Sequence, residues 1–171
     1  MAACLDLIPL AKASAPVREA VLSLNQQNVT ELSPLDEATF ARLIGQSFQA
    51  TAADGGAAFL IAFDQHAGYD SPNFRWFQAR YPRFVYVDRI AVATAARGRG
   101  LAGSLYDHLF AAATAAGHSI IGCEVNVDPP NPASDAFHAA RGFEEVGREL
   151  LGNGKTVRYL VKNLASGPAI G

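Results

Sequence analysis

A glycine-rich turn over residues 97–104 carries the residue types and spacing best suited to chemistry. It reads RGRGLAGS and lies between a strand-like run, residues 84–92, and a helix-like run, residues 105–116. A strand that feeds such a turn points several backbone N–H groups at one spot, and the dipole of the following helix adds partial positive charge there. Guanidinium groups match phosphate oxygens in geometry and charge, so the two arginines strengthen this interpretation. The pattern predicts a phosphate-binding site.

The glycines of this turn also fit a dinucleotide-binding fingerprint. Gly98, Gly100 and Gly103 match G-x-G-x-x-G letter for letter, and Glu124 lies roughly where a ribose-binding acid is sought. Three features count against an NAD(P)-dependent oxidoreductase. Residues 93–97 separate the turn from its strand, only one strand–helix unit and a hairpin follow it, and the preceding half does not alternate strands with helices. The oxidoreductase is kept as an alternative with less support.

A second pattern lies downstream, in residues 131–143, which read NPASDAFHAARGF. Asn131 is followed seven residues later by His138, and then by Gly142 and Phe143. Together with the glycine-rich turn, this pattern resembles the GNAT N-acetyltransferase superfamily, in a bacterial-type branch. The second signature of that superfamily is an Asn, an aromatic residue (usually Tyr) seven positions later, and then Gly-Phe. The resemblance extends over residues 81–148.

The first signature of that superfamily binds acyl-CoA and falls in the glycine-rich turn. It consists of Arg or Gln, two variable residues, Gly, one variable residue and then Gly or Ala, which Arg97, Gly100 and Ala102 fill. The resemblance implies an α+β fold with a central mixed, mostly antiparallel, twisted sheet of about six or seven strands, about four flanking helices and splayed central strands. It also implies one acetyltransferase domain over residues 1–164 and a tail over residues 165–171.

The same resemblance implies an enzyme that transfers an acetyl group from acetyl-CoA to a primary amine, by direct attack through a tetrahedral intermediate. The backbone of three strand residues would hydrogen-bond the pantetheine arm: Ile90, Ala91 and Val92. The N–H groups of the turn would bind the pyrophosphate: Arg97, Gly98, Arg99, Gly100, Leu101, Ala102 and Gly103. Asn131 would contact the pantetheine, with Ser134 one helical turn further along. Glycines suit this place because a Cβ would block the close approach of a diphosphate; the alternative is a tight strand-to-helix turn that needs glycine for its own backbone dihedrals.

Acetyl transfer to an amine needs a base that deprotonates the ammonium and an acid that protonates the departing thiolate. Glu124 lies in a strand-like run, and relatives with a glutamate on this strand use it, through water, as the base. The alternative for Glu124 is a residue that merely faces solvent. Asp88, on the other strand that lines the gap, is the rival base, although its neighbour Arg89 can instead make it a structural partner.

The position of the general acid departs from the superfamily pattern, because His138 stands where most relatives carry Tyr. A tyrosine with a pKa near ~10 suits protonation of a thiolate, whereas a histidine with a pKa near ~6.5 is largely unprotonated at neutral pH. His138 therefore acts as the acid only if its pKa is raised; otherwise it hydrogen-bonds the sulfur or has no chemical role. Tyr106 and Tyr86 are candidate substitutes. The missing Tyr also leaves a second function open, a non-catalytic acyl-CoA-binding or sensor domain.

Residues 65–82 are predicted to form a long, irregular, aromatic-rich loop. Four of its residues are candidates for binding the acceptor: Tyr69, Asp70, Trp76 and Tyr81. With Asp88 and Glu124 they could cage a cationic amine through carboxylate and cation–π contacts. A small or amino-acid-like amine is favoured over a peptide, because the loop should narrow the cleft. The alternative is a loop that its rings pin to the surface. An open, groove-shaped cleft with residues 65–82 packed elsewhere would contradict the preference for a small acceptor over a peptide.

Local patterns predict the elements that position these residues. Helices are predicted at 16–24, from 33 or 36 onward, at 105–116 and in a short stretch ending near 141; strands are predicted at 4–10, 46–52, 57–63, 84–92, 117–127, 143–151 and 156–161. Pro16 suits the first turn of a helix, and Ser33 or Asp36 suits a helix cap. Turns at 54–56 and 152–154 predict two hairpins.

Composition sets the remaining bounds. The chain has 171 residues, of which 50% are hydrophobic and 18% charged, which is typical of one globular domain. A net charge of −2 gives no reason to expect nucleic acid or an anionic membrane as a partner. Cys4 and Cys123 form no metal-type spacing and no disulfide framework, so we expect no metal and a cytoplasmic location. We expect no signal peptide or membrane span, and a homodimer through the closing hairpin or an apolar helix face stays open.

Overall fold

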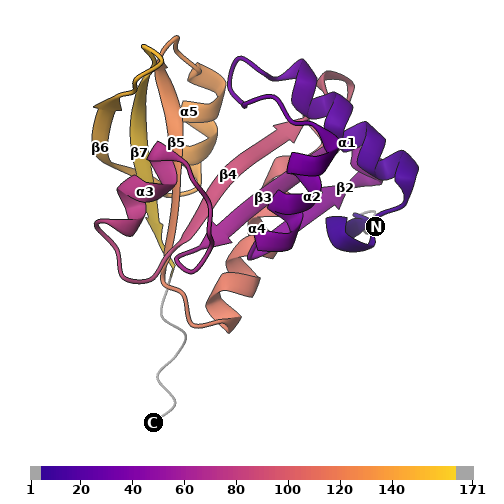
Figure 1. Cartoon of the computed structure of the whole chain (residues 1–171), viewed down its shortest axis with the longest axis horizontal. Helices are drawn as coiled ribbons and strands as arrows, with labels where there is room; N and C mark the ends of the chain where they lie inside the picture. The colour runs from indigo at the N-terminus through magenta and orange to yellow at the C-terminus, as the bar shows by residue number, and fades with distance from the viewer. Residues whose placement is uncertain (1–4, 165–171) are drawn as a thin grey trace.

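A seven-stranded sheet forms the centre of the computed structural model, which describes residues 5–164 (Figure 1). The strands are β1 (Leu7–Pro9), β2 (Gln49–Ala53), β3 (Ala58–Asp64), β4 (Val85–Val92), β5 (Ile120–Asp128), β6 (Glu144–Leu150) and β7 (Thr156–Asn163). Their order across the sheet is β1-β2-β3-β4-β5-β7-β6, and only β4 and β5 pair in parallel. The predicted mixed, mostly antiparallel sheet is confirmed. The predicted tail, residues 165–171, lies outside the described residues.

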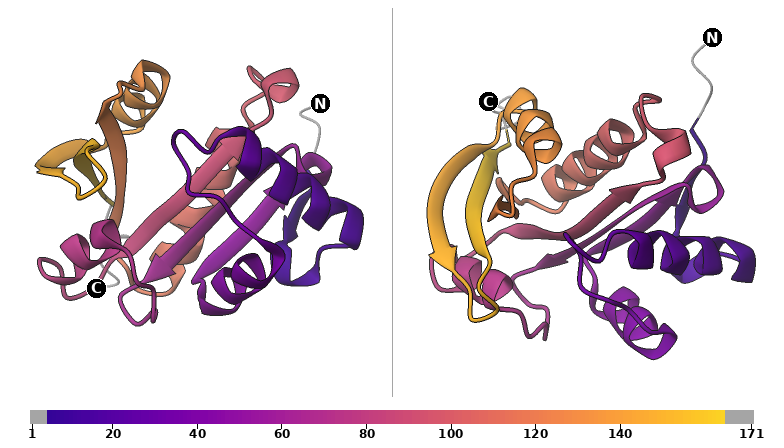
Figure 2. Two further views of the ribbon diagram at one scale, coloured as in Figure 1. Left: turned by 45° about the horizontal axis from the view of Figure 1, so that its top comes forward. Right: turned by 90° about the horizontal axis from the view of Figure 1, so that it is seen from above.

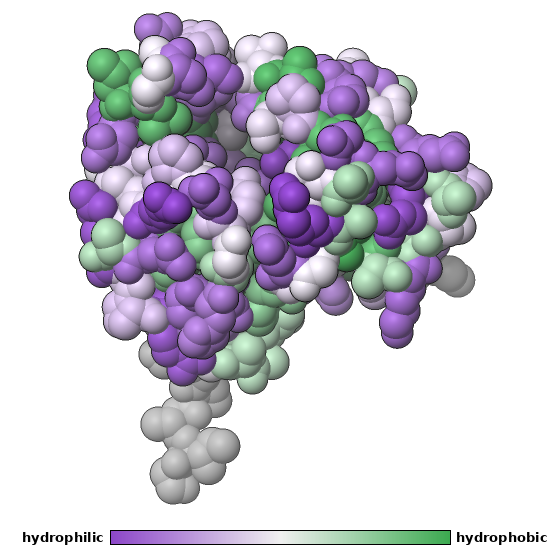
Figure 3. All heavy atoms as spheres, in the orientation of Figure 1, coloured by the Kyte–Doolittle hydropathy of each residue, from purple (hydrophilic) through white to green (hydrophobic). Residues whose placement is uncertain are grey.

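Five α-helices of the described residues flank the sheet, one more than expected. They are α1 (Ala15–Gln27), α2 (Glu37–Gln46), α3 (Pro72–Gln78), α4 (Leu101–Ala115) and α5 (Pro132–Ala140); short 3₁₀ turns are η1 (Leu10–Lys12), η2 (Asp54–Gly56) and η3 (Thr94–Ala96). α1 and α2 cover one face of the sheet and α4 covers the other (Figure 2). Within residues 5–164, no helix is long and apolar enough to cross a membrane. The face seen in Figure 3 is mostly hydrophilic, with smaller apolar patches.

Short-range signals fix the ends of several elements. Pro16 lies in the first turn of α1, where its missing N–H costs nothing. Asp36 caps α2, because its Oδ1 accepts a hydrogen bond from the Thr39 N–H at 2.7 Å. Gly142, just after α5, has φ +85°, a left-handed conformation that suits glycine at a helix end. The predicted caps and turns therefore account for where the chain changes direction.

β4 and β5 pair over only two residues of each strand. Val85 lies opposite Ile121 and Tyr86 opposite Gly122, and beyond these positions the two strands diverge (Figure 2). On their other sides β4 stays paired with β3, and β5 with β7. Past Tyr86, the facing edges of β4 and β5 are not covered by any strand of residues 5–164. The predicted splay of the central strands is confirmed.

A β-bulge in β4 lies just after the point where the two strands diverge. Ile61 of β3 pairs with Arg89 and Ala62 pairs with Val87, so Asp88 is the extra residue on β4. A bulge bends its strand and increases the local twist. The bulge therefore contributes to the divergence of β4 from β5, and it directs the side chains that follow.

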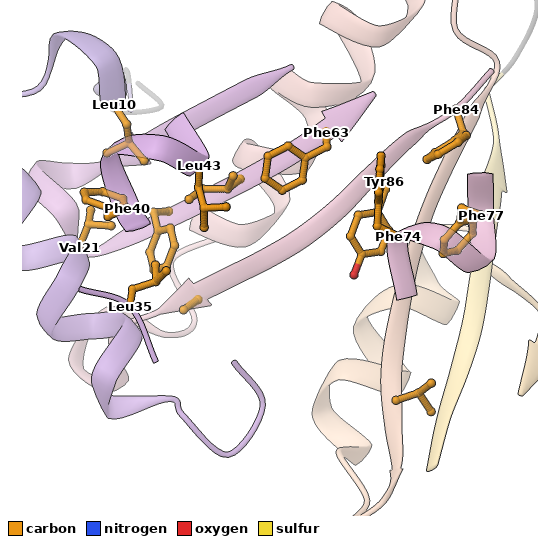
Figure 4. Close-up of a cluster of buried hydrophobic side chains, with 14 of the residues drawn as sticks. Leu10, Val21, Leu35, Phe40, Leu43, Phe63, Phe74, Phe77, Phe84 and Tyr86 are labelled. Atoms are coloured by element: carbon orange, nitrogen blue, oxygen red, sulfur yellow. The ribbon is translucent and has the colours of Figure 1, made fainter. Parts of the chain in front are cut away.

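The apolar core is divided between the two faces of the sheet. One cluster packs α1, α2 and α3 against one face and is rich in aromatic rings (Figure 4). The other packs α4 against the opposite face through residues that repeat at helical spacing: Leu101, Leu105, Leu109 and Ala113. Because both faces are anchored, β4 and β5 are held in place even where they do not pair with each other.

The segment predicted as an irregular loop, residues 65–82, contains helix α3, so that prediction was wrong in part. Phe74 and Phe77, three residues apart, are fully buried, and Trp76 is 8% exposed. Pro72 lies in the first turn of the helix. A seven-residue helix is too short to show a clear apolar period in the sequence. The aromatic residues were the signal: they are core residues of a short helix.

Candidate active site

A cavity of about 730 Å³ opens beside β4, beyond the point where β4 and β5 diverge. We call it the turn cavity, because the glycine-rich turn forms one wall. It is lined by Ile90, Ala91, Val92, Arg97, Gly98, Gly100, Leu101, Ala102, Gly103, Asn131 and Ser134, together with parts of the α1–α2 loop and α5. Every residue expected to bind acyl-CoA lines this cavity except Arg99. The structure thus places residues from four separate elements around one space.

The three glycines of the turn suit their positions for different structural reasons. Gly98 and Gly100 have φ values of +79° and +76°, which L side chains rarely adopt, and nothing else occupies the space of a Cβ there. Gly103 has ordinary helical geometry, but a Cβ would overlap the guanidinium of Arg141. Arg99 lies outside the cavity wall, with Nη1 2.6 Å from Asp54 Oδ2. The turn therefore offers open backbone N–H groups at the start of α4.

Arg141 lines the turn cavity and was not predicted as a binding residue. Its Nη1 donates to Asp107 Oδ1 at 2.8 Å, and its guanidinium lies over the Phe137 ring, 5.2 Å from the centroid. Arg141 directly follows the last residue of α5, four positions after Phe137, and this helical spacing could have indicated the contact. Two guanidinium groups, those of Arg97 and Arg141, therefore flank the helix start where we expected phosphate.

Glu124 lies on β5, where the sheet opens, and both its carboxylate oxygens accept hydrogen bonds. Tyr86 Oη donates to Oε2 at 2.6 Å, and Asn73 Nδ2 donates to Oε1 at 3.1 Å. Burial raises the pKa of Glu124 from its ordinary 4.5 to about 8; the hydrogen bonds from Tyr86 and Asn73 oppose the rise, and the nearby charge of Asp88 adds to it. A carboxylate with this pKa is a stronger base than an ordinary glutamate and is partly ionised near neutral pH.

Asp88, the rival base, is held in a buried ion pair. Arg89 Nε donates to Asp88 Oδ2 at 2.7 Å, with the two side chains 3% and 6% exposed, and Tyr69 Oη donates to Oδ1 at 2.6 Å. Arg89 also donates to Asn25 Oδ1 at 2.9 Å and to the backbone and hydroxyl oxygens of Ser33. The network ties β4 to α1 and to the α1–α2 loop. This geometry favours the structural role for Asp88.

His138, in the position of the family's acid, is 4% exposed and bonded through both ring nitrogens. Nδ1 lies 2.7 Å from the carbonyl oxygen of Ser134, which only accepts, so we assign the ring proton to Nδ1. Nε2 then accepts from Tyr106 Oη at 2.7 Å. Burial lowers the pKa of His138. The sequence required a raised pKa for an acid, and the structure shifts it in the opposite direction.

Two further cavities meet at Glu124. The narrow cavity, about 90 Å³, shares Ile90, Asn131 and His138 with the turn cavity. The loop cavity, about 600 Å³, is lined by the α1–α2 loop, the β6–β7 loop and the segment before α3, and it shares Glu124 with the narrow cavity. Lys155 Nζ donates to the Thr30 carbonyl at 2.6 Å and joins the two loops. Glu124 therefore stands between the turn cavity and the loop cavity.

The predicted aromatic cage is not assembled as expected. Tyr69 and Asp70 line the loop cavity, whereas Trp76 and Tyr81 do not. Trp76 stacks on Tyr159 with a centroid distance of 4.1 Å, and Tyr81 packs on Phe77. The reason is helix α3, which turns Trp76 into the core. Asp70, 81% exposed, pairs with Arg75. Sequence reasoning missed Asn73 here, because its partner Glu124 lies 51 residues away.

No group of three or more His, Cys, Asp or Glu side chains suited to a metal ion occurs among residues 5–164. The glycine-rich turn and Glu124 lie along the same opening between β4 and β5, because the turn cavity and the narrow cavity share lining residues. The site is therefore built from backbone N–H groups, guanidinium groups and one carboxylate of unusual pKa.

Solved structures with the same fold come from several acetyltransferases. The chain aligns with one from a NatC complex bound to Gag peptide and CoA (TM-score 0.71, 17% identity, covering 94% of this chain and 99% of that one). It aligns with the ribosomal-protein-S18-alanine N-acetyltransferase of Escherichia coli (0.67, 18%, 98% and 99%) and with Ard1 from Thermoplasma volcanium (0.72, 14%, 95% and 99%). At these identities the likeness shows the fold alone. A comparison with curated proteins finds no match.

The sequence itself matches a family model. The model of the acetyltransferase (GNAT) family aligns with residues 26–143, more than half of the chain, including β4, the glycine-rich turn, β5 and α5. Both signatures read from the sequence fall inside this span. The chain belongs to the GNAT family of acetyltransferases.

Proposed function

We propose that the protein transfers an acetyl group from acetyl-CoA to the primary amine of a small or amino-acid-like acceptor, by direct attack of the amine. The observation that carries this proposal is the opening between β4 and β5, with the glycine-rich turn at one end and Glu124 at the other. Membership of the GNAT family supports acetyl transfer in general. The acceptor and the roles below rest on the geometry of this chain.

The turn cavity fits acetyl-CoA. The N–H groups at the start of α4, together with Arg97 and Arg141, would take the pyrophosphate. The edge of β4 from Ile90 to Val92, which no strand of the described residues covers, would hydrogen-bond the pantetheine amides. Asn131 and Ser134 would contact the pantetheine from α5. The solved NatC complex, one chain of which shares this fold, is bound to CoA, which supports CoA as the ligand in general.

Glu124 would remove the proton from the acceptor's ammonium, through a water molecule. With its pKa near 8, it combines a usable ionised fraction at neutral pH with more basicity than an ordinary glutamate. Asp88 would not compete, because Arg89 and Tyr69 already occupy its oxygens. The acceptor would approach Glu124 through the loop cavity.

His138 would not protonate the departing thiolate. Its Nδ1 proton is given to Ser134, its Nε2 accepts from Tyr106, and burial lowers its pKa. We propose that His138 and Tyr106 act as a hydrogen-bonded pair that shapes the wall around the sulfur, and that the thiolate leaves without an acid from His138. The same feature is what a non-catalytic acyl-CoA sensor would show, so turnover is the decisive measurement.

A small acceptor is favoured because a hydrogen bond between two loops bridges the loop cavity. The Lys155–Thr30 hydrogen bond joins the β6–β7 and α1–α2 loops across its rim. An extended peptide would need this bridge to open, whereas a small amine would not. The other expectations from the sequence, one domain over residues 1–164, a cytoplasmic location and a homodimer, remain part of the proposal; sedimentation velocity tests the last.

Calorimetric titration with acetyl-CoA, CoA and NAD(P) tests the binding step, and an amine panel read by thiol release tests turnover. We expect both CoA species to bind and NAD(P) not to bind. Binding without turnover on any amine would favour the sensor, and NAD(P) binding would favour the oxidoreductase. Glu124→Gln should lower turnover by about 10²- to 10⁴-fold with acetyl-CoA affinity unchanged, the range typical of a lost general base. If Asp88→Asn causes the larger loss in a folded protein, the base assignment is wrong.

A further inference from the structure

Helix α3 brings one polar side chain, Asn73, to the carboxylate of Glu124. Resting on the proposed function, in which Glu124 is the base, we propose that Asn73 is a positioning residue that holds the Glu124 carboxylate in its ionised, reactive orientation. The geometry that carries this is a chain of hydrogen bonds from β7 through α3 to β5: Tyr159 Oη to Asn73 Oδ1 at 2.9 Å, and Asn73 Nδ2 to Glu124 Oε1 at 3.1 Å.

The direction of this chain is set by the ionised Glu124 carboxylate, which can only accept hydrogen bonds. A tyrosine hydroxyl donates to Asn73 Oδ1, which leaves the amide NH₂ facing the carboxylate. A flipped amide would place its oxygen against the ionised Glu124 carboxylate and lose that bond, while its NH₂ could still donate to the Tyr159 hydroxyl. Tyr86 occupies the second carboxylate oxygen from β4. Both oxygens of Glu124 therefore meet donors, an arrangement that suits the carboxylate better than the carboxylic acid.

Aromatic packing holds Asn73 in place. Phe74 lies beside Tyr86, with ring centroids 5.8 Å apart, and both are labelled in Figure 4. Trp76 stacks on the same Tyr159 that donates to Asn73. Phe77 packs so closely on Gly122 that a Cβ there would overlap the ring. The helix is thereby fixed on both sides of Asn73, which is what a precise hydrogen bond to the base requires.

The surroundings of Glu124 make its protonation sensitive to the hydrogen bond from Asn73. Burial and the charge of Asp88 favour the protonated acid, and the hydrogen bonds from Tyr86 and Asn73 oppose them. The titratable and charged groups around the carboxylate are Tyr86 and the Asp88–Arg89 pair on β4, Cys123 on β5, Tyr106 on α4, His138 on α5, Tyr159 on β7, and Glu31 in the α1–α2 loop. Removing the Asn73 donor should therefore shift the balance toward the acid.

The pH dependence of kcat/KM tests the proposal. Asn73→Ala should move the midpoint of the acid limb upward by about one pH unit, the size of one lost hydrogen bond to a charged group. Asn73→Asp should move it further, because it adds a like charge, and Tyr159→Phe should move it less. Gln78→Ala, on the exposed end of the same helix and remote from Glu124, is the matched control and should not move it. An unchanged midpoint with a raised acceptor KM would overturn the proposal, as would an equal loss at every pH.

A second measurement does not depend on catalysis. The free energy of unfolding in urea is measured for the free protein across pH. The difference in this free energy between wild type and Glu124→Gln reports the protonation of Glu124. In Asn73→Ala, the pH range over which this difference changes should end about one unit higher. In the Glu124→Gln background, Asn73→Ala should not change the pH dependence of stability. If this shift is found but no amine is acetylated, the proposed function fails and the placement of Asn73 stands. If the shift is absent, the placement fails whatever the activity.

Discussion

The turn cavity and the loop cavity are joined through the narrow cavity that holds Glu124, and they are built in different ways. About half of the wall of the turn cavity comes from one continuous stretch, the edge of β4 and the glycine turn with its left-handed residues, and the rest comes from the α1–α2 loop and α5. The wall of the loop cavity is a set of side-chain bonds between distant segments, such as Arg89 with Asn25 and Ser33. The glycine-turn part of the first cavity therefore depends on local conformation, whereas the loop cavity depends on long-range contacts.

The largest expected effect is a difference in stability loss between two Arg–Asp pairs: Arg89–Asp88 beside the loop cavity and Arg99–Asp54 at the glycine-rich turn. Arg89→Ala leaves Asp88 buried without its partner, and we expect a loss of about 3–5 kcal/mol in the free energy of unfolding. Arg99→Ala breaks a pair whose side chains are 52% and 44% exposed, and we expect a loss below about 1 kcal/mol. Urea unfolding measures both.

A double variant tests whether the loss in Arg89→Ala comes from the buried charge of Asp88. Adding Asp88→Asn to Arg89→Ala removes the uncompensated charge, so part of the lost stability should return. Equal losses for Arg89→Ala and Arg99→Ala, or no recovery in the double variant, would show that the two sides do not differ in this way.

The sequence allowed the turn side to be predicted because its signals are local. The spacing of Arg97, Gly100 and Ala102, together with the signature that begins at Asn131, carried the family resemblance, and the acyl-CoA-binding residues which that resemblance implies all line the turn cavity except Arg99. The caps and hairpins were readable for the same reason, since Asp36 and Thr39 are three residues apart. The divergence of β4 from β5 came only from the family resemblance, because no short-range pattern specifies where two parallel strands stop pairing.

The loop side could not be predicted to the same degree. Asn73 and Glu124 are 51 residues apart, and Asn25 and Arg89 are 64 apart, so neither contact leaves a periodic trace. Trp76 was expected at the acceptor because aromatic residues suit cations, but a short helix turns it inward. His138 showed that its type alone does not set its protonation: the carbonyl of Ser134 and burial decide it.

The next effect concerns pH and Glu124. The folded pKa is about 8, and the ordinary value is 4.5. Between these values the unfolded chain has lost a proton that the folded chain keeps, so Glu124 lowers stability as pH rises, by up to about 1.4 kcal/mol per pH unit, with no slope below or above that window. Relative to wild type, Glu124→Gln should therefore gain stability steadily from pH 5 to 8 in urea unfolding. A constant difference across this range would show that the carboxylate has an ordinary pKa.

A smaller effect distinguishes two glycines within the turn. Gly100→Ala places a side chain at φ +76°, and we expect a loss of about 1–2 kcal/mol in stability together with weaker acetyl-CoA binding. Gly103→Ala only displaces the flexible end of Arg141, so stability should hold or rise by up to about 1 kcal/mol. Its acetyl-CoA affinity should still fall, because Arg141 leaves its place beside the helix start. Calorimetry and urea unfolding on both variants check this, and unchanged affinity in Gly103→Ala would remove Arg141 from the binding wall.

The smallest effect belongs to the bridge over the loop cavity. The half-buried Lys155 side chain makes one solvent-exposed hydrogen bond to a backbone carbonyl, so Lys155→Ala should change the free energy of unfolding by about 0.5 kcal/mol or less. Its effect on selectivity should be clearer, because opening the rim admits larger acceptors: the ratio of kcat/KM for a peptide amine to that for a small amine should rise by about threefold, within the range of one lost weak contact. Lys12→Ala, remote from the cavity on η1, should leave the ratio unchanged. A ratio that stays constant in Lys155→Ala would mean that the two loops limit the acceptor by their shape alone, and that their hydrogen bond contributes nothing to the difference between the two sides.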